Sequence, residues 1–519
     1  MSPADGDNQQ RRRGRRDYDG LYDPLIDNNA RFLDPTRAAR RAGDDFDTTL
    51  YIADTLLFQD PAVFQDPDGE LIKAFKVFLT TEKIPVTTVV ETVDEEHRQR
   101  LQDLKGDAAA ILRRSWVTPI RLVVDERSAT PVDAWALLQR FRATLPNEDV
   151  YRVGLSHLLS ADIRGATMTA GATMTAGATM TAGATMTAGA TMTAGAGIRY
   201  QYAFAGLGGR TPVAYLGPQP APRQLTHRQP VIAVLDTGVG DHDWLRNDIS
   251  VEAAPGESFS SDEPENTGQT ITPLEGLLDD FAGHGTFIAG IIRQICPEAK
   301  IAMIKVMRAD GFVPEETMIR AITKVAIDHL DGTRRIDALS MSFGYYHEEP
   351  DDLKTDATLI GPLSALAAAG VMLFASAGND ATTRRMYPAA FSSQIKLISV
   401  GALNPNGTVA LFSNSGDWVQ VWERGAQVFS TQPTTFHGSL EPTARVTDTR
   451  TGMQRESIDP DDFGHGFATW SGTSFAAPAV AARYVRRLIA SREARADFDV
   501  LGNPEAALQT VLEGTDDDV

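Results

Sequence analysis

The sequence predicts an α/β protein whose main domain is a parallel sheet with helices on both faces, preceded by a small α+β domain. Short apolar segments beyond residue 228 alternate with helical patterns, which is typical of a parallel sheet covered on both sides. The chain has 519 residues, too many for one ordinary core. Its 42% of hydrophobic and 23% of charged residues are typical of a globular protein and exclude wholesale disorder.

Residues 1–45 are predicted to form a disordered, charged tail. They are rich in Arg, Asp, Asn and Gly and show little apolar periodicity. The arginine cluster at 11–16 could serve as a nucleic-acid arm or a targeting patch. Asp17 and Asp19 follow this cluster directly, which favours a solvated tail.

Residues 46–164 are predicted to fold as the small α+β domain. Clusters of β-favouring residues indicate strands, and apolar side chains that recur at helical spacing after Pro131 indicate a helix. The expected elements are strands at 72–80 and 119–124, a helix at 132–145 and a returning strand at 150–159.

Residues 165–226 are predicted to be a linker. Residues 165–194 are five identical copies of GATMTA, each with one bulky apolar side chain. Coils of six such residues would bury too little apolar surface to hold a β-helix together, so a flexible segment is favoured. The proline-rich stretch at 217–226 marks the boundary of the next domain.

Residues 227–495 are predicted to form the parallel-sheet domain, followed by an acidic tail at 496–519. The expected elements are strands at 231–235, 301–307, 338–343, 371–376 and 397–400, with helices that include 315–330 and 359–369. In such sheets, sites form beyond the carboxyl ends of the strands. Polar residues that follow the apolar segments are therefore the candidates for chemistry.

Charge and composition exclude several classes of partner. The 49 basic and 69 acidic residues give a formal net charge of −20, which repels a nucleic-acid backbone, so no nucleic-acid partner is predicted. The single cysteine, Cys296, excludes an intramolecular disulfide and is expected to be a small buried residue. The sequence shows neither an apolar run of about 18 residues nor an apolar stretch after the N-terminal basic cluster. We therefore expect no membrane contact and a cytoplasmic location.

Three polar motifs stand at predicted element boundaries. Asp236 follows the apolar run VIAVL, His284 precedes FIAGIIRQI, and Ser474 precedes FAAPAVAARYVRRLIA. Each motif alone is uninformative, because serine is a common helix cap and a histidine beside glycines is a common loop residue. Together they supply a hydroxyl nucleophile, an imidazole base and a carboxylate that fixes the imidazole tautomer.

The motifs VLDTGV, GHGTFIAG and SGTSFAAPAVAA, together with SAGN at 376–379, resemble those of the subtilisin-like serine peptidases in type and order. The resemblance covers about residues 228–495. It implies a serine endopeptidase that cleaves extended polypeptides through an acyl-enzyme, with a pseudoprotease or peptide-binding module as the alternative.

The resemblance implies a role for each matching residue. Ser474 would be the nucleophile, His284 the general base and then acid, and Asp236 its orienting partner. Asn379 would donate its side-chain amide to the oxyanion, together with the backbone N–H of Ser474. The implied substrate-binding residues are Ser342, Phe343 and Gly344 on one edge, and Ser376, Ala377 and Gly378 on the opposite wall.

The chain departs from the family pattern in two places. Phe475 and Ala479 stand where the family commonly has Met and His. A long polar insertion between Ser430 and Thr469 replaces a short loop, and it is either a lid or partner-binding loop or a tolerated surface insertion.

No cofactor is required for the implied chemistry, and no metal site is predicted. Acidic stretches at 262–265 and 459–462 are compatible with structural Ca²⁺, although solvated loop acids are favoured. His242, His437 and His465 lack a convincing metal-ligand spacing.

Three interpretations of the N-terminal domain remain open. It has the size and position of the N-terminal segment that blocks the cleft in many subtilases, but it carries no specific motif. It could be a propeptide-like inhibitor, a module that binds a regulatory protein partner, or a scaffold. Regulation is favoured, since an uncontrolled cytoplasmic protease would be hazardous.

Overall fold

The protein is analysed in a computed structural model. The described residues are 28–38, 46–124, 131–161, 210–226, 228–257, 265, 278–349, 359–437, 445–448, 450–456, 462–493 and 504–513. The GATMTA copies at 165–194 lie outside the described residues.

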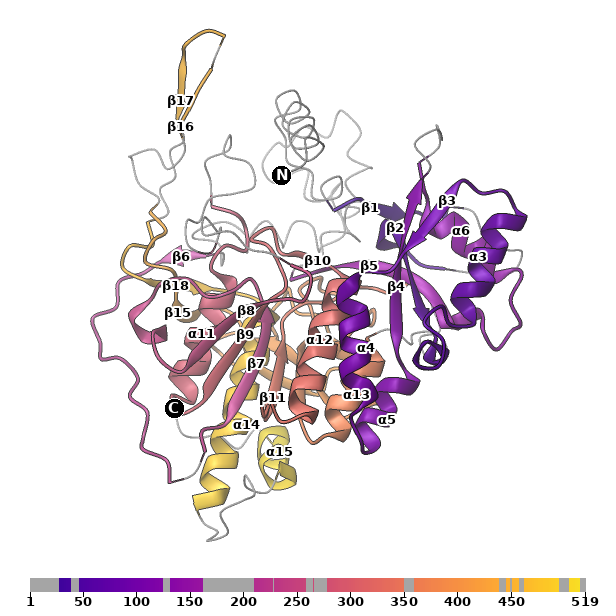
Figure 1. The fold of residues 1–519 in the computed structure, drawn as a ribbon. Coiled ribbons are helices and arrows are strands. Elements are labelled where there is room, and N and C mark those ends of the chain that lie inside the picture. The colour runs from indigo at the N-terminus through magenta and orange to yellow at the C-terminus, as the bar shows by residue number, and fades with distance from the viewer. Residues whose placement is uncertain are drawn as a thin grey trace, which may run out of the picture.

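A seven-stranded parallel sheet forms the centre of the structure (Figure 1). Its order is β14-β13-β12-β11-β7-β9-β8, and every pairing is parallel. The strands are β7 (Val231–Asp236), β8 (Ile249–Ala253), β9 (Lys300–Lys305), β11 (Ala338–Met341), β12 (Met372–Ser376), β13 (Leu397–Leu403) and β14 (Val421–Arg424). The predicted α/β fold class is thereby confirmed.

Helices cover both faces of this sheet, because successive side chains of each strand point to opposite faces and are apolar on both. Ile232 and Val234 of β7 pack in one hydrophobic cluster with the helices α11 (His284–Ile295) and α14 (Thr473–Glu493). Ala233 and Leu235 point the other way, into the cluster that contains α12 (Glu315–Leu330) and α13 (Ile360–Ala368). Burial on both sides explains the nearly continuous apolar runs in the sequence.

A second, antiparallel sheet belongs mainly to the N-terminal part of the chain. Its order is β10-β5-β2-β4-β3, and β1 also pairs with β2. The strands are β1 (Ala30–Leu33), β2 (Thr49–Gln59), β3 (Val86–Val89), β4 (Val117–Val124), β5 (Val153–Ser160) and β10 (Phe312–Pro314). Since β10 comes from the main domain, the sheet continues from one domain into the other.

Helices of the N-terminal domain pack on two sides. Phe75 of α3 (Leu71–Thr81) and Phe141 of α6 (Ala134–Arg142) both contact Phe58 of β2. The helices α4 (Thr92–Gln102) and α5 (Asp107–Arg114) instead contact α12 and α13 of the main domain, as Figure 1 shows.

Ion pairs join the two domains along α4 and α12. Arg320 donates from Nε and Nη2 to the two carboxylate oxygens of Asp94, at 2.9 and 2.8 Å. Arg100 donates to Asp328 at 2.8 Å. The Arg320 pair is almost buried, and loss of one partner from such a pair costs about 3–5 kcal/mol. The stability of the interface between the domains therefore depends on keeping both members of the Arg320–Asp94 pair.

The strand predicted at 72–80 was wrong, because these residues form the helix α3. The buried side chains Leu71, Ile72, Phe75, Phe78 and Leu79 recur at helical spacing, whereas Lys73, Lys76 and Val77 are exposed. The spacing of three and four residues was the correct signal, and the abundance of Phe and Val was misleading.

Both predicted tails contain regular structure. Residues 30–33, within the tail predicted at 1–45, form β1, where Leu33 is buried. The helix α15 (Pro504–Glu513), within the tail predicted at 496–519, packs against α14 and buries Ala507. Both elements gain their stability from tertiary contacts, which a short segment does not reveal by periodicity.

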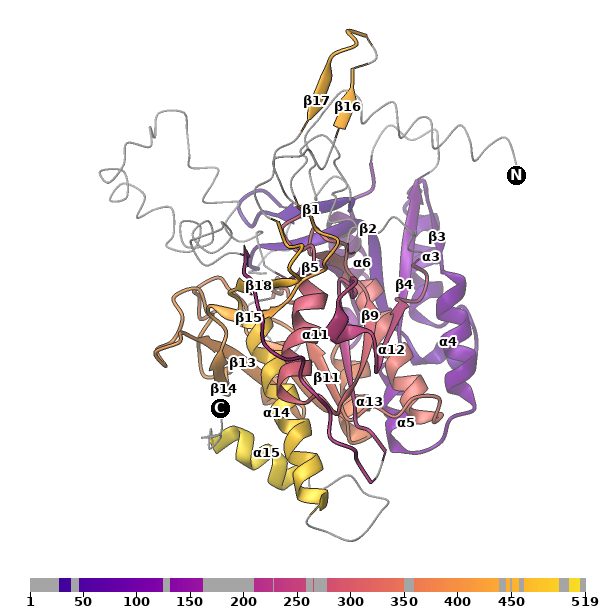
Figure 2. The same cartoon turned by 90° about the vertical axis from the view of Figure 1, so that its left-hand side faces the viewer.

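Two small sheets lie at or within the insertion between Ser430 and Thr469. One joins β6 (Thr211–Pro212), β15 (Val428–Thr431) and β18 (Phe467–Trp470). The other is a hairpin of β16 (Arg445–Thr447) and β17 (Gln454–Glu456), which projects from the rest of the structure in both views (Figures 1 and 2). Among the described residues, no helix is long and apolar enough to cross a membrane.

Candidate active site

Asp236 and His284 meet at the carboxyl edge of the central sheet. Asp236 is the last residue of β7, and His284 is the first residue of α11. His284 Nδ1 lies 2.8 Å from Asp236 Oδ1, and both side chains are buried. The backbone N–H of Thr237 donates to the same oxygen at 2.8 Å. The carboxylate is thus held by its own turn and presented to the imidazole.

The close approach of α11 to β7 requires glycine at position 285. A Cβ on Gly285 would clash with the carbonyl oxygen of Gly238 and lie 3.2 Å from Asp236 Oδ1. Gly283 precedes the helix in a left-handed conformation, with φ of 78°, which glycine adopts without strain. The two glycines beside His284 therefore set the geometry of the pair.

Glu265 holds the start of α11 and was missed by sequence reasoning. Its Oε2 accepts from the Gly283 N–H at 3.0 Å, and its Oε1 accepts from the Thr286 hydroxyl at 2.9 Å. Burial raises the pKa of Glu265, against the opposing effects of these donors and of Lys305. This residue ends the acidic stretch that was considered for Ca²⁺. Nothing in the sequence shows that its carboxylate caps a helix 18 residues away.

Ser474 is the second residue of α14, at the positive end of the helix dipole. Its side chain is buried, and its carbonyl oxygen accepts from the Ser342 hydroxyl at 2.9 Å. The ring of the next residue, Phe475, lies 5.3 Å from the ring of His284. The sequence-predicted serine is therefore brought to the edge of the sheet where Asp236 and His284 lie.

Within the described part of the chain, no hydrogen bond joins the Ser474 hydroxyl to His284. That contact stays a prediction. Catalytic hydrogen bonds are often long before a substrate binds, so its absence here does not exclude the role.

Asn379 lies against the start of the same helix. Its Oδ1 accepts from the backbone N–H of Thr473 at 2.8 Å and from the Thr473 hydroxyl at 3.0 Å. A Cβ on Gly472 would lie 3.7 Å from Asn379 Nδ2. With its oxygen occupied by the helix, the amide can act as an N–H donor beside Ser474.

The predicted substrate-binding residues separate into two kinds. Phe343, Ser376 and Ala377 are buried, and the Ala377 N–H and carbonyl are engaged by Val400 and Asn414. Gly378 donates its N–H to the Thr473 hydroxyl at 3.0 Å. These residues are therefore packed or hydrogen-bonded within the main domain, and their role in substrate binding stays a prediction.

The other predicted edge is paired with the N-terminal domain. Gly344 and Ser160 exchange two backbone hydrogen bonds, each of 3.0 Å. On its other side, β5 pairs with β10, and the N–H of Ala161 donates to the Gly311 carbonyl at 2.9 Å. The end of β5 therefore lies as an extended strand between two segments of the main domain.

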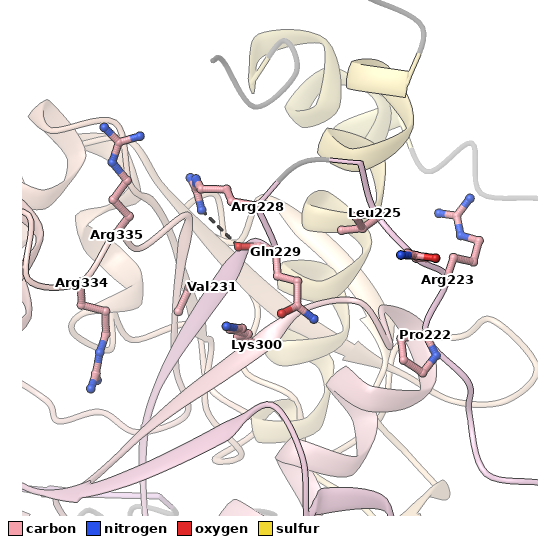
Figure 3. Close-up of a pocket in the computed structure, with 10 residues that line it drawn as sticks. Pro222, Arg223, Leu225, Arg228, Gln229, Val231, Lys300, Arg334 and Arg335 are labelled. Carbon is pink, nitrogen blue, oxygen red and sulfur yellow. Dashed lines mark hydrogen bonds between the residues drawn. The ribbon is translucent and has the colours of Figure 1, made fainter. Parts of the chain in front are cut away.

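A cavity of about 700 Å³ lies at the opposite edge of the sheet (Figure 3). Its lining includes Val231 and Lys300, the first residues of β7 and β9, and also Arg223, Arg228, Arg334 and Arg335. Arg228 pairs with both oxygens of Asp337, at 2.8 and 2.6 Å. This cationic cavity lies at the amino ends of the strands, whereas Asp236 lies at the carboxyl end of β7. The cavity is therefore separate from the candidate active site.

Cys296 is buried in the core, as predicted, and burial raises the pKa of its thiol to about 12. A thiol that stays protonated at neutral pH is a poor nucleophile and metal ligand.

Comparisons with known proteins agree with the motifs. The model of the subtilase family matches residues 227–489. An intracellular serine protease of Paenibacillus polymyxa is 28% identical over 234 residues, which cover 41% of this chain and 63% of the relative. The minor extracellular protease Epr of Bacillus subtilis is 28% identical over 233 residues, which cover 43% of this chain and 31% of the relative. The match thus spans less than two thirds of either relative.

Similar solved structures are also peptidases. A lanthipeptide protease covers 55% of this chain at 19% identity with a TM-score of 0.40, and the match covers 79% of that structure. A cold adapted subtilisin-like serine proteinase covers 56% of this chain at 19% identity with a TM-score of 0.36, and 84% of that structure is matched.

We predict that Gly285→Ala lowers the free energy of unfolding by about 1–3 kcal/mol, the usual cost of overpacking a tight contact. The added methyl group meets the Gly238 carbonyl and pushes α11 away from β7. Chemical denaturation measures the change. Gly154→Ala is the matched control, because a Cβ there meets no atom within 4 Å, and its effect should stay within about 0.5 kcal/mol. Equal stability of Gly285→Ala and wild type would contradict the close approach.

Proposed function

Because the chain belongs to the subtilase family of serine peptidases, we propose that it cleaves extended polypeptide segments through an acyl-enzyme formed on Ser474. The observation that carries this proposal is the 2.8 Å contact between His284 Nδ1 and Asp236 Oδ1, at the edge of the sheet where Ser474 begins a helix. An imidazole held by a buried carboxylate through Nδ1 has its Nε2 available as a base.

The proposed reaction assigns each proton to a residue. The Ser474 oxygen attacks the scissile carbonyl while His284 Nε2 takes the hydroxyl proton, and Asp236 stabilises the imidazolium. The oxyanion accepts from Asn379 Nδ2 and from the N–H of Ser474, at the positive end of α14. The amine then leaves with the proton from His284. Water, deprotonated by the same ring, attacks the acyl-enzyme and releases the acid, while His284 returns that proton to the Ser474 oxygen. No cofactor takes part in these steps.

Extended substrates fit the main-chain edges of the site that β5 occupies in this structure. Gly344 and Gly311 present backbone groups that already pair with a strand, in this case the end of β5. Backbone pairing of this kind gives affinity without demanding a side chain. A substrate would use the same groups once β5 leaves them.

A binder of extended peptides without peptidase activity is the second candidate. It is favoured by one observation, the lack of a Ser474–His284 hydrogen bond among the described residues. Against it stands the buried Asp236–His284 pair, which a peptide-binding cleft does not need. Reactivity of the serine separates the two candidates.

We predict that a small fluorophosphonate probe labels Ser474 in the full-length chain. The probe needs only an activated hydroxyl and an oxyanion site, so a strand on the substrate edge does not exclude it. Peptide mapping by mass spectrometry locates the label, which should vanish in Ser474→Ala and in His284→Ala. A folded wild-type chain that takes no label would support the binder.

We predict that Asn379→Ala lowers kcat by about 10²–10³, the loss found when one oxyanion donor is removed from a related enzyme. Asn379→Asp is the informative companion, because it keeps the oxygen that accepts from Thr473 and removes the N–H donor. Both variants should lose kcat with a smaller change in KM in steady-state peptide hydrolysis. If Asn379→Asp kept the full kcat, the side chain of Asn379 would have only a structural role.

We further propose that the N-terminal domain acts as an inhibitor that occupies the substrate edge. The support is the pairing of Ser160 with Gly344 and of Ala161 with Gly311, which leaves no free edge for a substrate. A module that recruits a regulatory protein partner would not need to place a strand there. The scaffold interpretation gives no reason for that strand to run toward Ser474.

We predict that self-cleavage, when it occurs, cuts within the first few residues after Ala161. Ser342 lies two residues before Gly344 and donates to the Ser474 carbonyl, so a cut close to Ala161 is expected if the chain keeps the Ser160–Gly344 register. Intact mass spectrometry of wild type against Ser474→Ala locates the cut. A first cut far inside residues 165–226, or only full-length chain after prolonged incubation, would contradict this register.

A further inference from the structure

A row of polar side chains joins β5, the start of α12 and the segment 344–348 where the two domains meet. In the register of β5 with β10, Ser160 is opposite Phe312, so His157 is opposite Glu315. On the other side Ser160 is opposite Gly344, and His347 lies three residues beyond Gly344. The row therefore combines one residue of the N-terminal domain with residues of the main domain.

The side chains in this row are in direct contact and buried. His157 Nδ1 lies 2.6 Å from Glu315 Oε2, and His157 Nε2 lies 2.8 Å from Glu348 Oε2. His347 Nδ1 lies 3.6 Å from Glu348 Oε2. One nitrogen of each histidine and one oxygen of Glu348 all lie within 4.8 Å of one another.

Two details of this cluster bear on metal binding. Glu348 Oε1 is fully buried and has no hydrogen-bond partner. His347 Nδ1 accepts the N–H of Glu349 at 3.0 Å, so this nitrogen carries a lone pair and no proton. A buried carboxylate oxygen without a partner is costly unless a cation or a donor occupies the site.

We propose that His157, His347 and Glu348 bind one divalent transition-metal ion of the zinc type across the contact between the N-terminal and main domains. The ion replaces the proton between His157 Nε2 and Glu348, which leaves to solvent, and it takes over the His347 lone pair from the Glu349 N–H. A water molecule completes four-coordination.

The donor set and its surroundings suit such an ion. Two imidazoles and one carboxylate are zinc ligands, and atoms at about 2.0–2.2 Å from one ion lie about 3–4 Å from each other. Glu315 accepts from His157 Nδ1, which fixes the tautomer that frees Nε2 for a metal, as in carboxylate–histidine–metal arrangements. The two charges of the ion balance Glu315 and Glu348, which leaves the buried site neutral.

The alternative occupant is a proton. Although burial lowers it, the pKa of His157 is raised to about 10 by Glu315 and Glu348, so without a metal the ring is a cation between two carboxylates. That state satisfies His157, but it leaves Glu348 Oε1 without a partner. Metal content distinguishes the two occupants directly.

An ion here would clamp the two domains beside the substrate edge. His157 and Ser160 belong to the same strand, and His347 and Gly344 to the same segment, so the ion would reinforce the pairing that covers the edge. This consequence rests on the proposed inhibition by β5, whereas binding of the ion does not.

The test uses the full-length Ser474→Ala chain, without a histidine tag, after dialysis against a chelator. Titration with Zn²⁺ followed by elemental analysis should give one ion per chain, and Co²⁺ should give the visible absorption of a four-coordinate site. His347→Gln should weaken binding by about 100-fold or more, and Glu315→Gln by about 10–100-fold, as for outer partners of metal ligands. His465→Gln, at an exposed position, is the control and should bind as the parent does.

Two results would overturn the proposal. One is a folded parent chain that retains no Zn²⁺ and shows no four-coordinate Co²⁺ spectrum. The other is equal binding by the parent and by His347→Gln, which would place the ion elsewhere. Zn²⁺ should also raise the melting temperature of the parent but not of His347→Gln. Because all these measurements use the Ser474→Ala chain, their outcome is independent of peptidase activity.

Discussion

The structure depends on one close approach, that of the first turn of α11 to the end of β7. Asp236 can hold His284 at 2.8 Å only because no side chain at position 285 separates the helix from the strand. Glu265 then fixes the same turn from the other side. The pair is buried, so few water molecules compete for it, and its geometry is set by packed backbone. The proposed base, His284, needs a nucleophile beside it. The helix α14 brings the Ser474 hydroxyl to the same edge of the sheet.

The second constraint is that two domains share one sheet. The strand β5 supplies backbone pairs to β2 on one side and to β10 on the other, and at Ser160 to Gly344 as well. Gly344 belongs to the segment whose backbone would pair with a substrate. Occupation by β5 and occupation by a substrate are therefore mutually exclusive on physical grounds. Under the proposed inhibition, control of the site would follow from this pairing and would need no distant communication between sites.

The sequence predicted what depends on local pattern and failed where distant contacts decide. The strands that contain Val234 and Phe374 were visible because burial on both faces makes them continuously apolar, and Asp236, His284 and Ser474 were visible because they follow or precede such runs. The helix at Phe75 was misread because its composition favours strands, although its spacing is helical. Glu265, the Ser160–Gly344 pairing and the contacts of His157 could not be found, since their partners are 18 to 191 residues away and no local periodicity encodes them.

If the N-terminal domain inhibits as proposed, an inhibitor on the same chain creates a problem of release. If the tether between the domains gives an effective concentration of about 1 mM, an intrinsic dissociation constant of about 1 µM leaves only about one molecule in a thousand open. The Arg320–Asp94 pair and the buried cluster at His157 strengthen the docked state further. Cutting the chain helps only because it lets a released domain diffuse away and dilutes it. Under the proposed inhibition, activity would therefore be governed by whatever weakens the interface between the domains, and the contacts of His157 lie in that interface beside the substrate edge.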